Sequence, residues 1–382
     1  MNVADLKFAV VGAGIGGLAA AIALRMLGAQ VVVLEQAPEL TEVGAGLQIS
    51  ANGMTVLRAL GVVKESPEQA QISHGTVLRD YKDGRFISLI PQPLAGPTYY
   101  YHRADLIDLL LKRAYKEDVE IRLKTKVQNI NESSGPVEIR LPNSQPLRVD
   151  CLIAADGGRS EIRATLNDQE RPRFTNQVAW RATIPWDRNL SSPKAHLTMG
   201  PGRHIVTYPL RDQSLLNIVA VEERSDWREE GWRLKGDPDE LRARFSDFGG
   251  NVREVLQKVQ ETYLWALFLR PVAGSWQNGR VALLGDSAHP TLPFMAQGAC
   301  LALEDAWVLA RSFERTTLAE SLEKYEHARS ARARRVVDVA SANARNFHLS
   351  GPMRLAAQIL LKAVGPRMGR RYDWIYDYDA TA

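Results

Sequence analysis

The sequence of 382 residues contains only two cysteines, Cys151 and Cys300, and they do not form a closely spaced pair. This scarcity argues against a disulfide framework and against a zinc site, since both need several cysteines at characteristic spacings. We therefore expect no bound metal, and a protein that works in the reducing cytoplasm.

Long apolar runs and blocks of basic residues are also missing. No uncharged stretch reaches the length of a transmembrane helix, and the N-terminus has no basic region followed by a cleavable apolar stretch. The net charge of +4 is spread along the chain, with no basic block beside interleaved aromatic residues. We expect neither a membrane nor a nucleic acid as partner, whereas anionic small molecules would be attracted.

The composition that is present is ordinary for a globular protein, with 45% hydrophobic and 24% charged residues. A chain of this length is sufficient for a large core and for two domains that share one active site.

The N-terminal part follows a strand–helix–strand pattern. Apolar runs at 8–11 (FAVV) and 31–34 (VVVL) predict two buried parallel strands, with a helix at 18–27 between them. The loop G-A-G-I-G-G at 12–17 joins the first strand to the helix, and Glu35 follows the second strand. In this context the glycine loop is a specific dinucleotide fingerprint, although NAD and FAD share it.

Each part of the fingerprint has a physical role. Gly12 permits a tight turn, Gly14 lets the backbone approach a pyrophosphate, and Gly17 lets the helix pack close to the strand. The helix N-terminus attracts phosphates, and Glu35 can accept hydrogen bonds from ribose hydroxyls. The residues expected to contact the dinucleotide are Gly12, Gly14, Ile15, Gly16, Gly17, Glu35 and Gln36.

The middle of the chain changes character. Alternating apolar and polar residues, rich in aromatics, predict a second domain with an antiparallel sheet and short helices. We place this second domain at 73–101 and 173–276, the dinucleotide-binding domain at 1–72, 102–172 and 277–350, and a helical tail at 351–382.

Two charged or apolar segments need separate interpretation. The mixed charges at 239–260 predict a solvated helix face. The apolar segment 353–368 is expected to pack on the domain or on a dimer mate in preference to a membrane. The protein is expected to be a monomer or a homodimer.

Two further motifs follow predicted strands. The sequence at 156–163 fits D-G-x-x-S-x-x-R, and G-D-S-A-H-P at 285–290 continues to Pro293, Gln297 and Gly298. Together with the glycine loop, these segments resemble the three hallmark motifs of the single-component, FAD-dependent aromatic hydroxylases, the para-hydroxybenzoate hydroxylase-like family. The resemblance spans residues 7 to about 347.

Four stretches are most similar to the salicylate, 3-hydroxybenzoate and 6-hydroxynicotinate hydroxylase branch of that family. They are Gly44-Ala45-Gly46, 180–182 (WRA), 295–300 (MAQGAC) and 374–379 (WIYDYD). The resemblance implies an α/β fold, in which a Rossmann-like FAD-binding domain with a parallel sheet is joined to an α+β substrate domain with an antiparallel sheet.

The resemblance also implies an FAD site. Asp286 would bond a ribityl hydroxyl, and Gly298 and Ala299 would place a helix N-terminus near the flavin pyrimidine. Arg103 resembles the arginine that meets the cofactor, and Asp156 the residue that bridges FAD and the reduced nicotinamide. A helix cap for Asp156 and a surface position for Arg103 remain alternatives. The further residues expected at FAD are Gly46, Gln48, Arg103, Val127, Asp156, Asp286, Pro293, Gly298 and Ala299.

The implied reaction hydroxylates a small aromatic substrate, a phenolic or heteroaromatic acid. NADH or NADPH would reduce FAD, and O2 would form a flavin C4a-hydroperoxide that delivers one oxygen atom to the ring. The sequence has no second dinucleotide fingerprint, which fits a nicotinamide that docks transiently. The protein must then place the ring, exclude water and raise the ring's electron density.

The strand at 203–209 resembles the substrate-facing strand of the branch. His204 and Tyr208 share one face of it. His204 is expected to titrate near neutrality, and Tyr208 to hydrogen-bond a carboxylate or phenolate, although one of them can instead simply pack under the sheet. Pro293 and Gln48 complete the candidate catalytic set. Hydroxynicotinate hydroxylases carry histidines where this chain has Gln48 and Phe294, which makes hydroxynicotinate a doubtful substrate.

Other assignments remain open. His289 and His102 have no clear partner and are interpreted as structural. A flavin halogenase would need W-x-W-x-I-P, whereas 180–185 reads W-R-A-T-I-P. A reductase of the same fold and a non-catalytic flavin sensor are further alternatives, and the intact Pro293, Gln297 and Gly298 argue against the sensor.

Overall fold

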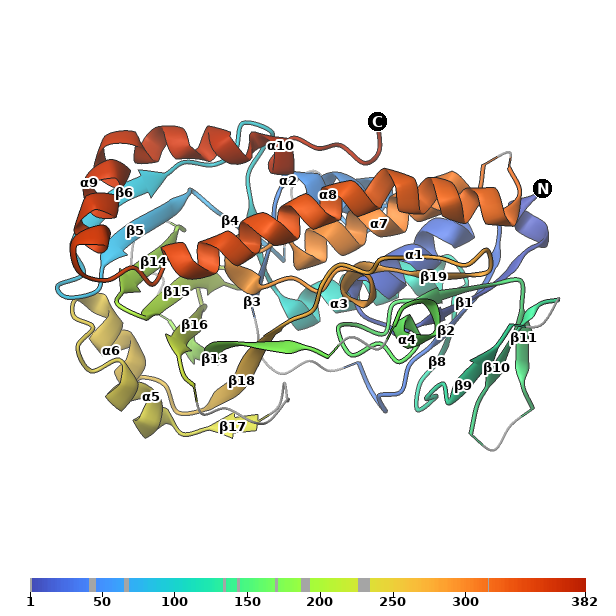
Figure 1. The fold of residues 1–382 in the computed structure, drawn as a ribbon, viewed down its shortest axis with the longest axis horizontal. Helices are drawn as coiled ribbons and strands as arrows, with labels where there is room; N and C mark the ends of the chain where they lie inside the picture. The colour runs from blue at the N-terminus through green and yellow to red at the C-terminus, as the bar shows by residue number, and fades with distance from the viewer. Residues whose placement is uncertain are drawn as a thin grey trace.

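The computed structural model describes residues 2–40, 46–64, 69–132, 135–142, 145–168, 171–186, 193–225, 234–314 and 316–382. The molecule is elongated, with a parallel-sheet domain at one end and a large antiparallel sheet at the other (Figure 1). Gly44 and Ala45, in the first branch-specific stretch, lie outside the described residues.

The parallel sheet is built from short apolar strands in the order β19-β12-β1-β2-β8, and every neighbouring pair in it is parallel. The strands are β1 (Lys7–Val11), β2 (Gln30–Leu34), β8 (Glu120–Arg122), β12 (Cys151–Ala154) and β19 (Val281–Leu283). Strands buried on both faces read as continuous runs of Val, Ile and Leu, which is why 8–11 and 31–34 were predictable.

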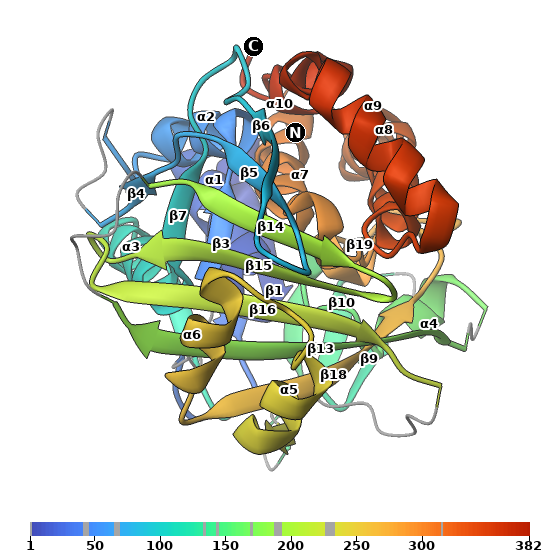
Figure 2. The same cartoon turned by 90° about the vertical axis from the view of Figure 1, so that its left-hand side faces the viewer.

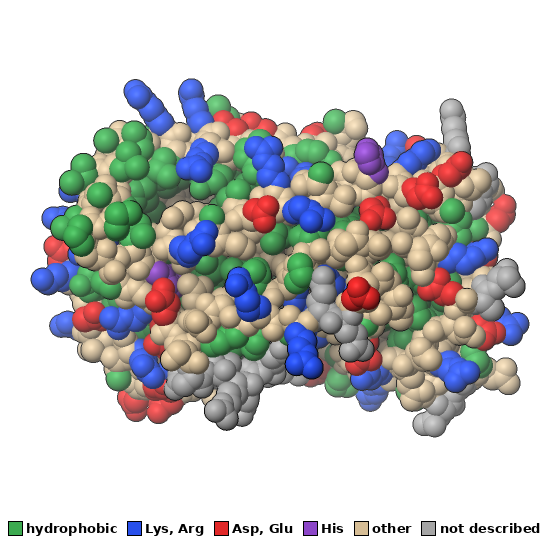
Figure 3. Space-filling model, viewed as in Figure 1, with side chains coloured by type: hydrophobic (Ala, Val, Ile, Leu, Met, Phe, Trp, Pro, Cys, Tyr) green, Lys and Arg blue, Asp and Glu red, His purple; other side chains and the backbone are tan. Residues whose placement is uncertain are grey.

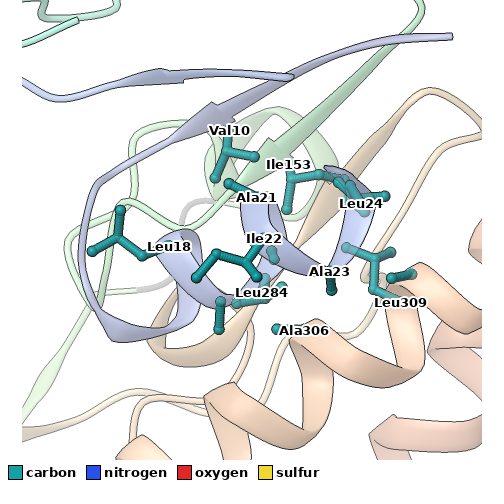
Figure 4. Close-up of a cluster of buried hydrophobic side chains, with 14 of the residues drawn as sticks. Val10, Leu18, Ala21, Ile22, Ala23, Leu24, Ile153, Leu284, Ala306 and Leu309 are labelled. Carbon is teal, nitrogen blue, oxygen red and sulfur yellow. The ribbon is translucent and has the colours of Figure 1, made fainter. Parts of the chain in front are cut away.

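Three helices pack together on this sheet: α1 (Ile15–Met26), α3 (Arg103–Lys116) and α7 (Gly298–Ser312). Ile22 of α1 lies between the sheet and α7, close to Leu284 and Ala306 (Figure 4). The small three-stranded sheet of β9 (Asn129–Asn131), β10 (Val137–Arg140) and β11 (Leu147–Val149) contributes to the same core.

The antiparallel domain is an eight-stranded sheet in the order β17-β18-β13-β16-β15-β14-β5-β6, in which only the β14–β5 pair is parallel. Its strands are β5 (Thr76–Asp80), β6 (Phe86–Ile90), β13 (Arg173–Pro185), β14 (Ala195–Gly200), β15 (Arg203–Leu210), β16 (Leu215–Glu223), β17 (Leu234–Gly236) and β18 (Thr262–Leu269). The predicted combination of a parallel-sheet domain with an antiparallel-sheet domain is confirmed.

The segment 239–260 is helical, and most of its charged side chains lie on the solvent side, as predicted. It forms two short helices, α5 (Pro238–Arg244) and α6 (Asn251–Gln257), on the outer side of the large sheet (Figure 2). Leu241 and Val255 are buried against Trp180 and neighbouring apolar residues of the sheet. In the sequence, the many charged residues obscure the helical spacing of the buried apolar residues, and the break between α5 and α6 interrupts that spacing.

A second three-stranded sheet joins the two domains. Its order is β3 (Gly46–Ile49), β7 (Tyr99–His102) and β4 (Gln71–Ile72), and β3 leads into α2 (Ala51–Ala59). The end of the segment 73–101 therefore pairs with β3 and not with the eight-stranded sheet.

The C-terminal part consists of helices. α8 (Leu318–Asn346) begins at a capping box formed by Thr317 and Glu320 and runs along both domains (Figure 1). α9 (Gly351–Met368) packs against β6 but leaves apolar side chains exposed on its outer face, where hydrophobic side chains gather in Figure 3. Among the helices that the structure describes, none combines the length and apolar character needed to cross a membrane.

The remaining elements are short. They are η1 (Val3–Asp5), α4 (Arg163–Leu166), η2 (Gly285–Ser287), η3 (Pro293–Met295), η4 (Gly369–Tyr372) and α10 (Asp373–Tyr376).

Candidate active site

The glycine loop turns from β1 into α1 through backbone that needs glycine. Gly12 has φ +102°, and a Cβ on it would lie 2.4 Å from the carbonyl oxygen of Ala155. A Cβ on Gly17 would lie 2.0 Å from the carbonyl oxygen of Gly12, so the helix can approach the strand only with glycine there. Gly14, in contrast, has no protein atom within 4 Å of a built Cβ and faces open space.

Open space at this loop belongs to a cavity of about 740 Å³. Six of the predicted cofactor residues line it: Gly12, Gly14, Glu35, Gln36, Val127 and Asp156. Ile15, Gly16 and Gly17 are buried inside α1 and are not among the described lining residues. A Cβ on Gly16 would lie 2.7 Å from Leu284 Cδ2, so this glycine lets α1 approach the core rather than a ligand.

Hydrogen bonds fix the side chain of Glu35 beside the glycine loop. Its carboxylate accepts hydrogen bonds from the backbone N–H groups of Ala13 and Ala37, both at 2.8 Å. A carboxylate with two oxygens retains acceptor capacity for ribose hydroxyls and would repel a 2′-phosphate. The fixed carboxylate and the open face of Gly14 fit the adenosine and pyrophosphate of FAD.

The cavity has a further wall of which only Val127 was predicted. Residues 125–130 line it, because the N–H of Thr125 donates to the carbonyl of Glu35 at 2.8 Å and holds the chain after β8 beside Glu35. Arg159, a variable position of the motif at 156–163, and Thr165 line it as well. For the other residues of 125–130 the only signal would have been the placement of β8 next to β2.

The second and third motifs meet around Ser287. Its hydroxyl donates to Asp156 at 2.9 Å and accepts from the N–H of Gly157 at 3.0 Å. Arg163 binds the carbonyls of Pro271, Ser287 and Ala288, so the motif arginine anchors the neighbouring loop. Burial raises the pKa of Asp156.

Asp286, Arg103 and Gly298 come together at the N-terminus of α7. The Asp286 side chain is exposed, although the surrounding protein desolvates it and raises its pKa while the charge of Arg103 opposes the shift. A Cβ on Gly298, the first residue of α7, would lie 3.9 Å from Asp286 Oδ1. An accessible carboxylate, a cation and the free N–H groups of Gly298 and Ala299 fit the ribityl and pyrimidine parts of a flavin.

The loop before α7 is held by buried amides. Gln297 donates to Ser50 Oγ at 2.9 Å and accepts from Asn52 at 3.0 Å, which tethers the loop to the start of α2. Pro293 opens η3, and Ala296 adopts a left-handed conformation with φ +53°. Ser50 and Asn52 belong to no motif, so sequence reasoning missed their role.

His204 and Tyr208 lie on the same face of β15 but against different neighbours. His204 packs against Phe294, with ring centroids 5.4 Å apart. Burial together with His348 lowers the pKa of His204 well below the usual value, so the expectation that it titrates near neutrality is wrong. Tyr208 packs against Tyr100 at 4.9 Å. Burial raises the pKa of Tyr208, while Arg181 and a hydrogen bond with Asn217 oppose this shift.

Gln48 and Arg181 complete the described polar groups near this face. Gln48 is half-buried on β3, opposite Tyr100 of β7. Arg181 pairs with Val219 on β16, and its guanidinium lies 4.5 Å from the centre of the Trp265 ring. Arg181 belongs to the branch-specific stretch 180–182 but had no predicted role, because the sheet register that brings it to this face is not visible in the sequence.

The expectation that His289 lacks a clear partner is wrong. Its Nε2 lies 2.5 Å from Asp305 Oδ2, and Arg329 donates to the other oxygen of Asp305 at 2.7 Å, with all three side chains fully buried. His102 caps the N-terminus of α3 without a side-chain hydrogen bond and pairs with Gly46 across the small sheet.

Comparison with known proteins agrees with this geometry. The sequence matches the family described as FAD binding domain over residues 5–340. It is 34% identical to 3-hydroxybenzoate 6-hydroxylase of Polaromonas naphthalenivorans (strain CJ2), over 99% of this chain and 97% of that protein. It is 30% identical to 6-hydroxynicotinate 3-monooxygenase of Bordetella bronchiseptica, over 88% of this chain and 91% of that protein. A salicylate hydroxylase structure with bound substrate has a TM-score of 0.83 at 26% identity, over 98% of this chain and 96% of that one.

The parallel sheet, the glycine loop and the carboxylate–arginine–helix cluster define an FAD-binding flavoprotein. The chain belongs to the FAD binding domain family, and within it to the aromatic-ring monooxygenases. The resemblance stated from the three motifs, the enzyme class and the cofactor FAD are thereby confirmed.

Proposed function

We propose that this monooxygenase hydroxylates a small phenolic acid, with NADH or NADPH as reductant and O2 as oxidant. The observation that carries the proposal is the position of the buried face bearing His204 and Tyr208. Phe294, one residue after Pro293, packs against His204, and α7 begins four residues further on at Gly298. A ring held on this face would therefore lie beside the flavin end of the site.

FAD would be held at its adenosine end by Gly14 and Glu35, and at its flavin end by Asp286, Arg103 and the N-terminus of α7. When bound, FAD supplies the activation of dioxygen that no amino acid side chain provides. The protein's own residues orient the substrate, exclude water and control its proton.

The substrate face combines apolar walls with a few polar groups, as small-molecule sites generally do. Tyr208 would hydrogen-bond an oxygen of the substrate, and close packing against Tyr100 and Gly46 supports this role by holding its ring in one position. Arg181, on the same face, provides positive charge suited to a carboxylate. Gln48 is a further candidate to orient a ring substituent.

Loss of the phenolic proton increases the reactivity of the substrate, because the ring of a phenolate is more electron-rich than the ring of a phenol. His204 is neutral at physiological pH, because burial lowers its pKa. A neutral imidazole can accept the phenolic proton. We therefore assign His204 the role of base and Tyr208 the role of hydrogen-bond partner to the same oxygen or to the carboxylate.

The halogenase alternative is disfavoured by the position of Trp180. Its side chain is fully buried among the residues under α5 and α6, and its indole N–H donates to Glu222 at 3.2 Å. It therefore faces away from His204 and Tyr208. We place the enzyme in the cytoplasm, as a monomer or a homodimer.

A screen tests the proposed function. The purified yellow protein is mixed with NADH or NADPH and a panel of hydroxybenzoates, aminobenzoates and hydroxypyridine acids, and NAD(P)H oxidation, O2 uptake and product mass are recorded. At least one phenolic acid should accelerate oxidation and yield a product heavier by one oxygen. A non-catalytic sensor would bind FAD and aromatic acids without any hydroxylated product.

A further inference from the structure

His204 is the inner end of a continuous chain of hydrogen bonds that reaches the protein surface. Its Nδ1 lies 2.7 Å from Nε2 of His348, and Nδ1 of His348 lies 3.0 Å from Oε1 of Glu223. The exposed fraction rises along the chain, from 1% for His204 and 6% for His348 to 56% for the Glu223 side chain. The chain therefore connects a fully buried imidazole with solvent.

The stronger of two contacts to Nδ1 of His348 selects the tautomers of both histidines. The Glu223 carboxylate, at 3.0 Å, only accepts hydrogen bonds, whereas Nε2 of Gln177, at 3.2 Å, donates. Because the bond to the carboxylate is shorter and charge-assisted, we assign the hydrogen to Nδ1 of a neutral His348. Nε2 of His348 is then an acceptor, and Nδ1 of His204 must donate to it. Nε2 of a neutral His204 is left with a lone pair, which makes it the basic atom of the inner imidazole.

Three elements hold this arrangement in place. His204 is on β15, Glu223 ends β16, and His348 follows α8. The backbone of Gly202 ties them together, because its N–H donates to the carbonyl of His348 at 3.1 Å and its carbonyl accepts from the N–H of Glu223 at 2.9 Å. Main-chain hydrogen bonds therefore help to hold the side chains of His204, His348 and Glu223 in line, in addition to the contacts between the side chains.

The neighbours of the chain are apolar or uncharged. Phe294 and Phe347 flank the ring of His204, with centroids 5.4 and 5.3 Å away. Nε2 of Gln177 on β13 lies 3.2 Å from Nδ1 of His348 and donates to the carbonyl of Ala344 at 3.3 Å. Among the described residues, Glu223 and His204 are the titratable groups bonded to His348.

We propose that His204, His348 and Glu223 form a proton relay that carries the phenolic proton of the substrate out to solvent. The proposal rests on the proposed function. The phenol O–H bond breaks as Nε2 of His204 takes the proton, and Nδ1 of His204 passes its own proton to Nε2 of His348. Nδ1 of His348 then releases a proton to Glu223 or to water beside it, and no other group changes charge.

The relay explains why so buried a histidine can act as a base. A charged imidazolium in the apolar surroundings of Phe294 would be costly, and burial indeed lowers the pKa of both histidines, opposed at His348 by Glu223. Transfer of a proton from His204 to His348, and from His348 to Glu223, avoids a lasting positive charge on the buried imidazole. His348 and Glu223 are accordingly positioning residues that act through His204.

The tautomers are tested directly by NMR of the FAD-loaded protein labelled with ¹⁵N-histidine, without any substrate. His204 and His348 should both show a hydrogen on Nδ1 and an unprotonated Nε2 at neutral pH. The opposite tautomer at His204 would overturn the relay, because Nε2 would then have no lone pair to offer.

Proton transfer is tested by stopped-flow pH jumps on the FAD-loaded protein with bound 3-hydroxybenzoate as the phenolic probe, following its phenolate absorbance. His348→Gln keeps an acceptor for His204 and a donor for Glu223 but does not relay protons, so phenolate formation should slow by about 10²-fold. Glu223→Gln, at a half-exposed position, should slow it less and shift its pH profile. His327→Gln on the exposed face of α8 is the matched control and should match wild type.

The outcomes separate the two proposals. If wild type hydroxylates a phenolic acid, and both variants form phenolate at the wild-type rate with an unchanged pH profile, the relay is wrong and the proposed function stands. If wild type hydroxylates no aromatic acid, the proposed function fails and the relay fails with it. Slowed phenolate formation in His348→Gln with unchanged 3-hydroxybenzoate affinity supports the relay.

Discussion

The side-chain oxygen of Asn217 accepts a hydrogen bond from the backbone N–H of Gly46 at 2.8 Å, and both residues are buried. This bond joins β16 of the large sheet to β3. The approach is so close that a Cβ on Gly46 would lie 2.7 Å from Cε2 of Tyr208. Gly46 therefore sets how close β3, with Gln48, can lie to the face that bears Tyr208.

Gly46→Ala should disturb this junction. The added methyl group must push Tyr208 or Asn217 away, at a cost of about 1–3 kcal/mol for overpacking. Substrate affinity and the yield of hydroxylated product per NAD(P)H should both fall. The free energy of unfolding, substrate affinity and product yield measure the effect, and Gly135→Ala, where a Cβ meets no atom within 4 Å, serves as control.

Gly14 and Gly17 should respond differently to the same substitution. Gly14→Ala leaves the protein unstrained, because a Cβ there meets no protein atom, but it would meet the pyrophosphate of FAD. We expect a near-normal melting temperature for the apoprotein and FAD affinity weakened by at least about 10-fold, or about 1.4 kcal/mol.

Gly17→Ala should instead destabilise the apoprotein itself, because its Cβ would collide with the carbonyl of Gly12. Thermal melting of the two apoproteins, together with FAD titration by fluorescence quenching, makes the comparison. Equal melting temperatures for the two variants would contradict the assignment of Gly17 to helix–strand packing.

The buried cluster of His289, Asp305 and Arg329 predicts a pH dependence of stability. Burial alone would raise the pKa of Asp305, but the charges of His289 and Arg329 lower it from 3.8 to about 2. A carboxyl with a depressed folded-state pKa stabilises the fold above its unfolded value, and this contribution disappears as the pH falls from about 4 to about 2.

Asp305→Asn should therefore be less stable than wild type at neutral pH. Near pH 2, where wild type has lost the contribution of the ionised carboxylate, most of this difference should be gone. The expected loss at neutral pH is about 3 kcal/mol, because the buried Arg329 loses one carboxylate partner and keeps another, Glu304, at 2.6 Å. Chemical denaturation at several pH values tests this. A stability difference that does not vary between pH 5 and pH 2 would contradict it.

Tyr208→Phe should slow hydroxylation and leave FAD bound. The hydroxyl is lost but the ring contact with Tyr100 is retained, so the sheet should remain packed. We expect a loss of about 10²-fold in product formation, as for removal of one hydrogen-bonding group at a reacting oxygen. Unchanged turnover would remove Tyr208 from the mechanism.

Much of the fold was predictable because buried parallel strands have an unmistakable composition. The runs at 8–11 and 31–34 and the glycine loop between them specify β1, α1 and β2. The mixed charges at 239–260 predicted the solvated helix face, but not the break that divides the segment into α5 and α6.

The site was predictable where a local motif carries the chemistry and not where sheet register does. Asp156 and Asp286 follow strands within recognisable motifs, so their placement could be anticipated. Asn217 and Arg181 reach the site only because β16 and β13 pair in one register, and His348 reaches His204 from a part of the chain 144 residues away. Neither the strand register nor this long-range contact can be inferred from the sequence pattern.

Insertion of oxygen from O2 into an aromatic ring is the reaction assigned to this flavoprotein, and ¹⁸O2 follows that oxygen atom. The purified enzyme, NADH or NADPH, and the phenolic acid that best stimulates oxidation are incubated under ¹⁸O2, and the product is analysed by mass spectrometry. We expect a hydroxylated product carrying one ¹⁸O atom. NAD(P)H oxidation that yields only hydrogen peroxide with every aromatic acid, or a product whose new oxygen comes from water, would contradict it.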